Sequence, residues 1–246
     1  MQFTHKENYT IRSNEIGPDG SARPDSIAAL LQEIAGNHAK ILEFDIEDLR
    51  SRDITWVLHK LHVRMKRYPD WRETIQITTW PSSGDRLRAY RDFSIKDQKG
   101  EELGVALSYW LLMNLKNRRP VRIPDEIIQM GLTSQNHVLP LTKEKFEWEL
   151  NESAEKSTFK VRRTDLDINQ HANNVAYIRW IMETVDEQTY TNGHCNEFSV
   201  QYNEEAGLRD TIYALTLKTG KHSHRHQLKK HGKTIARAKS VWEETD

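Results

Sequence analysis

The spacing of hydrophobic and polar residues changes from helical to alternating within the first half of the chain. Apolar residues recur at helical spacing from Ile27 to Ile41, which predicts a helix of about four turns with a wide apolar face. Asp25 or Ser26, directly before this run, is expected to cap the helix. A strand-like segment, YTIRS, precedes it.

Several segments after this helix alternate between apolar and polar side chains, as half-buried strands do. They read VLHKLHVRM, ETIQITTW, RLRAYRDFSIKD and LGVALSYWLLMNL. In the first of them, Leu61 and Val63 are expected to face the core, with Lys60, His62 and Arg64 on the exposed face. The last segment is apolar on both sides, which is typical of a central strand covered by a helix.

The second half repeats this order after an aperiodic stretch. Residues 131–156 contain a proline and a cluster of acids and favour a linker between domains. A strand (STFKVRR), a helix (NNVAYIRWIMETVDEQ) and four strands (EFSVQYNEE, DTIYALTLK, HRHQLKK and KTIARAKSVWE) follow. The chain thus predicts a duplicated α+β unit, one helix across a curved antiparallel sheet, divided into 1–130, the linker 131–156, and 157–246.

Composition excludes several classes of function. Lys and Arg together number 36, as do Asp and Glu, so no global charge points to nucleic acid or a membrane surface. The single cysteine, Cys195, excludes an internal disulfide and a cysteine-rich metal site. The N-terminus lacks the apolar core of a signal peptide, and no apolar run approaches the roughly 20 residues that cross a bilayer. We therefore predict a cytoplasmic protein.

A dense polar stretch, TDLDINQHANN, stands directly before the second helix. Asn173 or Asn174 is expected to cap that helix, which leaves Asp167, Asn169 and His171 unexplained. Their alternate spacing would place them on one side of an extended segment, beside a helix N-terminus that favours negative charge. An acid, an amide and an imidazole in this position suit the polarisation of a carbonyl and the transfer of a proton. A polar capping loop without chemistry accounts for the same residue types.

The segment DLDINQHANNVAYIRWIMETV resembles the motif of the acyl-acyl carrier protein (acyl-ACP) thioesterases, which terminate fatty acyl chains in plants and bacteria. Their pattern, Asp-x-Asn-x-His-x-Asn-Asn before a helix, fits residues 167–174. LLQEIAGNHA, WVLHKLHVRMKRYPDWRETIQITTWP, YRDFSIKD and YWLLMNLKNRRPVRIPDE are similar to further segments of that family in the same order. The resemblance therefore covers most of the chain.

This resemblance implies a double hotdog fold, in which two sheets each wrap around a long central helix. It implies hydrolysis of a fatty acyl thioester carried on the phosphopantetheine arm of acyl carrier protein, in fatty acid biosynthesis, without a metal or redox cofactor. The first domain would form most of the acyl tunnel and the second would be catalytic. An acyl-CoA thioesterase on the same fold and a non-catalytic acyl-carrier-binding protein are the alternatives.

The resemblance also assigns roles to residues by position. Asp167, Asn169 and His171 are the motif residues, and Glu205 in QYNEEAGLRD falls on a glutamate of the family. Ala206 falls where plant members have a cysteine, so we expect direct attack by water. Glu205 would be the general base, Asn169 and His171 would position the water or thioester and stabilise the oxyanion, and Asp167 would orient them.

Three further residues have other expected roles. Glu204 is one register slip away from Glu205 and is the alternative base. Asp165 is expected to be structural. Cys195, in a predicted turn, is expected to be a bystander because reactive thiols need an electropositive setting.

Histidines and basic residues also occur outside the polar stretch, and other roles are expected for them. His222, His224 and His226 have the spacing of one strand face, but no acid or cysteine joins them and the strand is expected to face solvent, so no metal site is predicted. His38 is expected to be packed and hydrogen-bonded. The basic runs 218–239 and 116–122 are candidate docking surfaces for the acidic carrier protein. Nucleic acid and membrane insertion are not expected, and the oligomeric state, a homodimer included, is left open.

Overall fold

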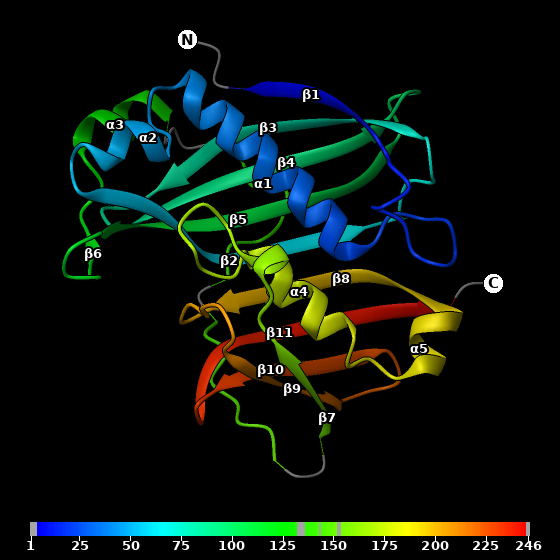
Figure 1. The fold of residues 1–246 in the computed structure, drawn as a ribbon. Coiled ribbons are helices and arrows are strands. Elements are labelled where there is room, and N and C mark those ends of the chain that lie inside the picture. The colour runs from blue at the N-terminus through cyan, green and yellow to red at the C-terminus, as the bar shows by residue number, and fades with distance from the viewer. Residues whose placement is uncertain (1–3, 132–135, 143, 152–153, 245–246) are drawn as a thin grey trace. The chain divides into compact units, whose positions relative to one another are not determined.

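The chain forms two units that are each built around an antiparallel sheet (Figure 1). The computed structural model describes residues 4–131, 136–142, 144–151 and 154–244. The units are Met1–Thr142 and Lys143–Asp246, so the division falls within the expected linker 131–156. Parts of that linker, at 132–135, 143 and 152–153, lie outside the described residues.

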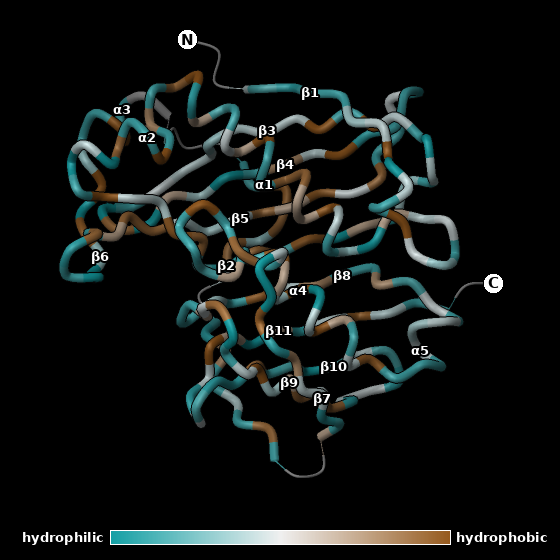
Figure 2. The backbone as a smooth tube through the Cα atoms, in the orientation of Figure 1, coloured by the Kyte–Doolittle hydropathy of each residue, from teal (hydrophilic) through white to brown (hydrophobic). Residues whose placement is uncertain are grey.

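The first unit has one long helix, α1, across its sheet, as Figure 1 shows. The strand order is β1-β3-β4-β5-β2, and the short β6 pairs with β5. Figure 2 shows hydrophobic residues recurring along β3, β4 and β5 between more polar ones. The bounds are β1 (His5–Thr10), α1 (Pro24–Ile41), α2 (Ile46–Arg50), β2 (Ile54–Met65), β3 (Thr74–Gly84), β4 (Arg88–Asp97), β5 (Glu102–Asn114), β6 (Pro120–Val121) and α3 (Asp125–Gly131).

Helix α1 begins earlier than the sequence predicts. Its N-cap is Arg23, and Pro24 takes the first helical position, where a residue without an N–H donor is tolerated. The expected capping by Asp25 or Ser26 is therefore wrong, and the Asp25 carboxylate instead pairs with Arg23 Nε at 3.0 Å. His38 is buried, and its Nδ1 lies 2.9 Å from an Arg91 guanidinium nitrogen, which confirms the predicted packed histidine.

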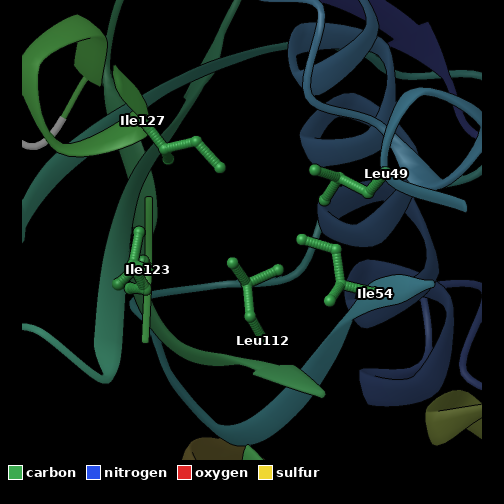
Figure 3. Packing of buried hydrophobic residues seen from close by; sticks show 6 residues of the cluster. Leu49, Ile54, Leu112, Ile123 and Ile127 are labelled. Atoms are coloured by element: carbon green, nitrogen blue, oxygen red, sulfur yellow. The ribbon is translucent and has the colours of Figure 1, made fainter. Parts of the chain in front are cut away.

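Two features complete the core of the first unit. Apolar side chains from α2, β2, β5 and the region of α3 converge in one cluster, shown in Figure 3 and formed in part by Leu49, Ile54, Leu112, Ile123 and Ile127. The register of β2 against β5 shifts between Leu58 and Lys60, and Lys60 lies opposite Tyr109. Lys60 is buried, with its Nζ over the Tyr109 ring, so its expected exposure is wrong.

The second unit has the same sheet topology, in the order β7-β9-β10-β11-β8. Its helix α4 lies across this sheet (Figure 1). The predicted repeat of one helix-and-sheet unit is thereby confirmed. The bounds are β7 (Glu155–Lys160), the 3₁₀ turn η1 (Arg163–Asp165), α4 (Asn174–Met182), α5 (Glu187–Asn192), β8 (Gly193–Tyr202), β9 (Thr211–Lys218), β10 (Ser223–Lys230) and β11 (Lys233–Glu244).

Helix α4 is shorter than predicted. Asn173 caps it by accepting the backbone N–H of Val175 at 3.0 Å, as expected. The predicted continuation to residue 188 is wrong because the helix ends at Met182. The Thr184 hydroxyl then donates to the carbonyl of Ile181 at 2.7 Å, and Asp186 caps the separate helix α5.

Two further expectations for the second unit are wrong. Cys195 lies within β8 instead of a turn and is 2% exposed. His224 and His226 face the interior of the unit instead of solvent. His226 Nδ1 is 2.7 Å from the Thr216 hydroxyl and its Nε2 is 2.8 Å from the Ser240 hydroxyl. Burial lowers the pKa of His226 to about 3, so the imidazole is neutral at pH 7.

Candidate active site

The polar stretch predicted as a site forms the loop that joins β7 to α4. At its start, Asp165 is buried and its carboxylate accepts the backbone N–H of Arg162 at 2.8 Å. The other carboxylate oxygen lies 3.4 Å from a guanidinium nitrogen of Arg179, on α4. Asp165 therefore fixes the entry of the loop.

Residues Asp167–His171 form a tight turn, so the expected extended segment is wrong. The N–H of Asp167 donates to the carbonyl of His171 at 2.8 Å, and Gln170 has a positive φ of 63°. Asp167 Oδ1 accepts the backbone N–H groups of Asn169 at 2.8 Å and His171 at 3.2 Å. A short acidic side chain that bonds to the backbone ahead of it favours a turn over a strand. The three motif residues are thus held together by a turn.

A second segment, at the end of β8, faces this turn. His171 pairs with Gly207 in an isolated β-bridge, and the N–H of Ala172 donates to the carbonyl of Ala206 at 2.8 Å. This pairing places His171 Nε2 3.3 Å from Glu205 Oε2, with the two side chains 36% and 37% exposed. An imidazole and a carboxylate at this distance, both open to solvent, form an acid–base pair that water can reach.

The other predicted residues occupy different places. Asn169 is exposed near the tip of the turn, with its backbone N–H bonded to Asp167. Glu204 is exposed, and its carbonyl accepts the Tyr177 hydroxyl at 3.1 Å. The geometry therefore joins His171 to Glu205 through side chains, and Asp167 to His171 and Asn169 through the backbone.

Sequence reasoning missed residues that hold the Glu205 segment. Lys230 Nζ donates to the carbonyl of Glu205 at 2.8 Å and lies 3.1 Å from Asp210 Oδ2. That carboxylate oxygen also accepts the N–H of Gly207 at 2.8 Å. Burial opposes ionisation of Asp210, but the bonds from Gly207 and Lys230 outweigh it and lower its pKa. Nothing in the spacing of its basic run distinguishes Lys230 from its neighbours in the sequence. Tyr177 could have been found more easily, because it lies shortly after the motif on the apolar helix.

The basic run 218–239 is less positive than its composition indicates. Lys229 and Arg237 both pair with Glu149, at 3.0 and 2.5 Å, and Lys239 pairs with Glu144 at 2.5 Å. Burial would raise the pKa of Glu149, but bonds from Gln227 and Lys229 and the nearby cations lower it to about 2.

Other basic residues of the two runs also have acidic partners. Lys230 pairs with Asp210, and Lys221 lies 3.6 Å from Glu244. In the run 116–122, Lys116 pairs with Asp53 at 2.5 Å. Several of the predicted docking charges are therefore partly neutralised by neighbouring carboxylates.

Comparison with known proteins identifies the family. The acyl-ACP thioesterase N-terminal domain matches residues 2–130, and the C-terminal domain of the same family matches residues 148–244. The chain belongs to the acyl-ACP thioesterase family. Both segments that carry the candidate site residues, 167–174 and 201–210, lie within the C-terminal match.

Curated plant relatives support this assignment. Oleoyl-acyl carrier protein thioesterase 2, chloroplastic, of Arabidopsis thaliana is 32% identical over 87% of this chain and 63% of its own length. Dodecanoyl-[acyl-carrier-protein] hydrolase, chloroplastic, of Cinnamomum camphora is 31% identical over 96% of this chain and 67% of its own length. The chain thus spans about two thirds of the length of these relatives.

Solved structures confirm the double hotdog fold class. The 12:0-ACP thioesterase from Umbellularia californica superposes with a TM-score of 0.90 at 29% identity, covering 100% of this chain and 99% of that one. An acyl-ACP thioesterase from Bacteroides thetaiotaomicron gives a TM-score of 0.89 at 22% identity, covering 98% of each chain, and supports the fold alone.

Three further findings concern the predictions about metal binding, membrane insertion and cellular location. Among the described residues, no group of His, Cys, Asp and Glu could hold a metal ion, and none of the described helices is long and apolar enough to span a membrane. The plant relatives are named as chloroplastic proteins, so the predicted cytoplasmic location of this chain is not confirmed.

Proposed function

We propose that this chain hydrolyses the thioester of a fatty acyl chain carried on acyl carrier protein, releasing free fatty acid and the carrier. The family assignment and the names of the plant relatives support this reaction. The observation that carries it is the contact of His171 Nε2 with Glu205 Oε2 at 3.3 Å, where both side chains are open to water. The motif alone is compatible with a capping loop, whereas this pairing across two segments suits proton transfer.

In the proposed reaction Glu205 is the general base. Its carboxylate takes a proton from a water molecule, whose oxygen attacks the thioester carbonyl. Asn169 and His171 position the reactants and stabilise the negative oxygen that forms. The tetrahedral intermediate collapses, the carbon–sulfur bond breaks, and the proton on Glu205 returns to the departing thiolate of the phosphopantetheine. Asp167 acts through the backbone of the turn that presents Asn169 and His171.

Water is the proposed nucleophile because neither Ala206 nor Cys195 is suited to attack the thioester. Ala206 presents only a methyl group where plant members have a cysteine, and it is fully buried. Cys195 is 2% exposed within β8, and its Sγ lies 3.5 Å from the carbonyl of Glu197. A thiol buried within a strand is shielded from an incoming thioester, so it is not expected to act as the nucleophile.

The two domains take different parts in this proposal. Residues 1–130 bind the acyl chain, 131–156 link the domains and 157–246 carry the catalytic residues. Acyl carrier protein is the proposed partner, and it docks on exposed cations that steer its acidic surface. Lys218 and Lys233 in one basic run and Arg119 in the other are exposed.

A paired assay tests the reaction and its carrier. The protein is given acyl-ACP and acyl-CoA of the same chain length, and release of thiol and fatty acid is measured for each. Faster turnover of acyl-ACP supports the proposal. Preference for acyl-CoA would instead identify an acyl-CoA thioesterase, and binding of acyl-ACP without turnover of either substrate would identify a non-catalytic carrier-binding protein.

Charge reversal tests the docking step separately. Lys218→Glu with Lys233→Glu, or Arg119→Glu, is expected to raise KM for acyl-ACP while leaving hydrolysis of a short acyl-pantetheine unchanged. The difference should shrink as salt rises, because screening weakens steering between exposed charges. Equal losses with both substrates would contradict a docking role and point to a structural one.

A further inference from the structure

Three side chains of the first unit form a hydrogen-bonded series that the proposed hydrolysis does not use. The Ser83 hydroxyl, in β3, lies 2.8 Å from Nε2 of His137. His137 Nδ1 lies 2.8 Å from Oδ2 of Asp92, in β4. A hydroxyl, an imidazole and a carboxylate in this order have the arrangement of a nucleophile, a general base and the group that orients the base.

The surroundings of Asp92 set the tautomer of His137. The Asp92 side chain is 0% exposed, and its Oδ1 accepts the backbone N–H of Val138 at 2.8 Å. An ionised carboxylate accepts hydrogen bonds only, so Nδ1 of His137 carries the proton that it donates to Asp92. In this tautomer Nε2 is a lone-pair acceptor directed at the hydroxyl of Ser83.

The position of the imidazole ring is constrained by packing as well. His137 packs edge-on to the ring of Tyr90, with centroids 5.9 Å apart and planes at 83°. Its side chain is 14% exposed. A base whose ring is held by a carboxylate on one side and an aromatic ring on another keeps its orientation toward the nucleophile.

An irregularity in β3 presents Ser83 to this base. The register against β4 shifts between Pro81 and Ser83, and a shift of this kind re-aims side chains. Ser82 is fully buried, and its hydroxyl lies 3.2 Å from Nδ1, the nitrogen that already bonds to Asp92. Ser83 is half-buried beside the exposed residues 84–88 and faces the basic nitrogen. Ser83 therefore combines access with activation, and Ser82 has neither.

We propose that Ser83 is an activated nucleophile that accepts acyl groups from small activated esters, such as aryl esters. In the acylation step a bond forms between Ser83 Oγ and the carbonyl carbon, and the bond from that carbon to the aryl oxygen breaks. The hydroxyl proton passes to Nε2 of His137 and then to the departing aryl oxygen. Water attacks the resulting serine ester through the same base, which restores Ser83 and releases the acid.

The size of the substrate follows from the position of Ser83. Its hydroxyl lies next to an exposed turn, where a small acyl donor with a good leaving group reaches it directly. The contacts from Asp92 to residues 137 and 138 would also anchor this segment to β4 without any reaction. Labelling chemistry separates the two roles, because an anchor does not make Ser83 reactive.

The experiment uses the full chain and a fluorophosphonate probe, which reacts with activated serines, followed by peptide mass spectrometry. Label is expected on Ser83, at a rate faster than in the urea-unfolded chain. Ser83→Ala should abolish it, and His137→Gln should slow it by roughly 100-fold, the scale of a general base. Ser82→Ala, the matched control, should keep it.

Aryl ester hydrolysis gives a second readout. A burst of p-nitrophenol from p-nitrophenyl acetate should survive Glu205→Ala and disappear in Ser83→Ala. Acyl-ACP hydrolysis should show the opposite dependence, so the two proposals fail separately. Labelling of Ser83 no faster than in the urea-unfolded chain, or an unchanged rate in folded His137→Gln, would overturn the activated serine. The unfolding midpoint of each variant establishes that it is folded.

Discussion

The loops that enter α1 and α4 share one backbone design but differ in the side chains that they present. In the first unit the N–H of Gly17 donates to the carbonyl of Ser21 at 2.8 Å, and in the second Asp167 donates to His171 at the same distance. Ser21 and His171 both form isolated bridges to the facing segment. The repeat therefore extends to individual hydrogen bonds of the loop.

The facing segments match in the same way. Ala22 donates to the carbonyl of Pro69 at 2.8 Å, as Ala172 donates to that of Ala206. Arg72 and Arg209, three residues after these carbonyls, have positive φ values of 67° and 69°. Both turns thus hold the loop before the helix in one register.

The side chains at matching positions are chemically different. Ser21 occupies the position of His171, and Tyr68, directly before Pro69, occupies that of Glu205. Tyr68 is 7% exposed, whereas the Glu205 side chain is 37% exposed. The fold provides the same frame twice, and only the second copy has an imidazole and a carboxylate that water reaches. The shared backbone of the two loops therefore does not by itself create an active site.

The largest expected effect follows from removing that chemistry. His171→Ala and Glu205→Ala should each lower turnover of acyl-ACP by roughly 100-fold or more, the scale of one acid–base or oxyanion group. Asn169→Ala is expected to do the same. The double variant of His171 and Glu205 should lose much less than the product of the single losses, because groups that act as a unit are not additive. Steady-state kinetics with acyl-ACP give these values.

The first unit provides matched controls for this prediction. Ser21→Ala and Tyr68→Phe change the corresponding positions and should leave turnover within about two-fold, since neither carries an acid–base group of the proposed reaction. If Glu204→Ala abolished activity while Glu205→Ala kept it, the register of the proposed base would be wrong by one residue. If the variants stayed active and only had a lower unfolding midpoint, the loop would act as a helix cap without a catalytic role.

A second comparison concerns the cores of the two sheets. Phe93 in β4 pairs with Thr79 and Ala106, and His226 in β10 pairs with Thr216 and Ala238. Phe93 is 1% exposed and His226 is fully buried. One core position is therefore apolar in the first unit and titratable in the second.

Acid should consequently destabilise the second unit through His226. Its folded pKa of about 3 lies below the ordinary unfolded value, so between these values only the unfolded chain binds the proton. Stability is complete above about pH 6.5 and falls as pH drops toward 3, by up to about 1.4 kcal/mol per pH unit from this group. Urea midpoints of the wild type and His226→Phe at pH 8 and pH 5 measure the difference.

In His226→Phe the midpoint should depend less steeply on pH, although the variant is less stable at pH 8 because Thr216 and Ser240 lose a hydrogen-bond partner. An equally steep pH dependence in both proteins would assign the acid effect to other groups. His224, whose pKa burial also lowers, is the next group to test.

Much of this frame could be predicted from the sequence, because periodicity reports which faces are buried. The repeat, the strand order along the chain and the Asn173 cap followed from local patterns. The break after Met182 did not, since it depends on side-chain bonds of Thr184 and Asp186 that spacing does not reveal. Burial of His226 depends on hydroxyl partners from two other strands.

Less of the candidate site than of the fold could be predicted from the sequence. Local residue types indicated a candidate site at Asp167–His171, but Glu205 is more than thirty residues away and was found only through family resemblance. The alternate spacing suggested a strand, and the side chain of Asp167 formed a turn instead. The Lys230 contact to the carbonyl of Glu205 required the folded sheet.

A smaller effect is expected at Asp167, which acts through the backbone. Asp167→Asn keeps an oxygen that accepts the N–H groups of Asn169 and His171, so turnover should fall by no more than about 10-fold. Asp167→Ala removes that acceptor and should also lower stability by about 1 kcal/mol. The first unit offers a comparable change, although Asp19 corresponds in position to Asn169. Asp19 Oδ1 accepts the N–H of Ser21 at 3.2 Å, so Asp19→Ala should affect stability but not turnover. A 100-fold loss in Asp167→Asn would give the carboxylate a direct role.

The smallest expected effect is at Cys195, where the proposed mechanism assigns no chemistry. The thiol is buried in β8, so Cys195→Ala should leave kcat and KM for acyl-ACP nearly unchanged and lower the unfolding midpoint slightly through lost packing. Thiol-directed reagents should likewise react slowly with the folded chain, since a thiol buried within a strand is shielded from them. A loss of turnover of 100-fold or more in a folded Cys195→Ala protein would overturn direct attack by water. Trapping an acyl group on Cys195 during turnover would do the same, because in the proposed reaction the carbonyl carbon bonds only to the oxygen of the water that Glu205 activates.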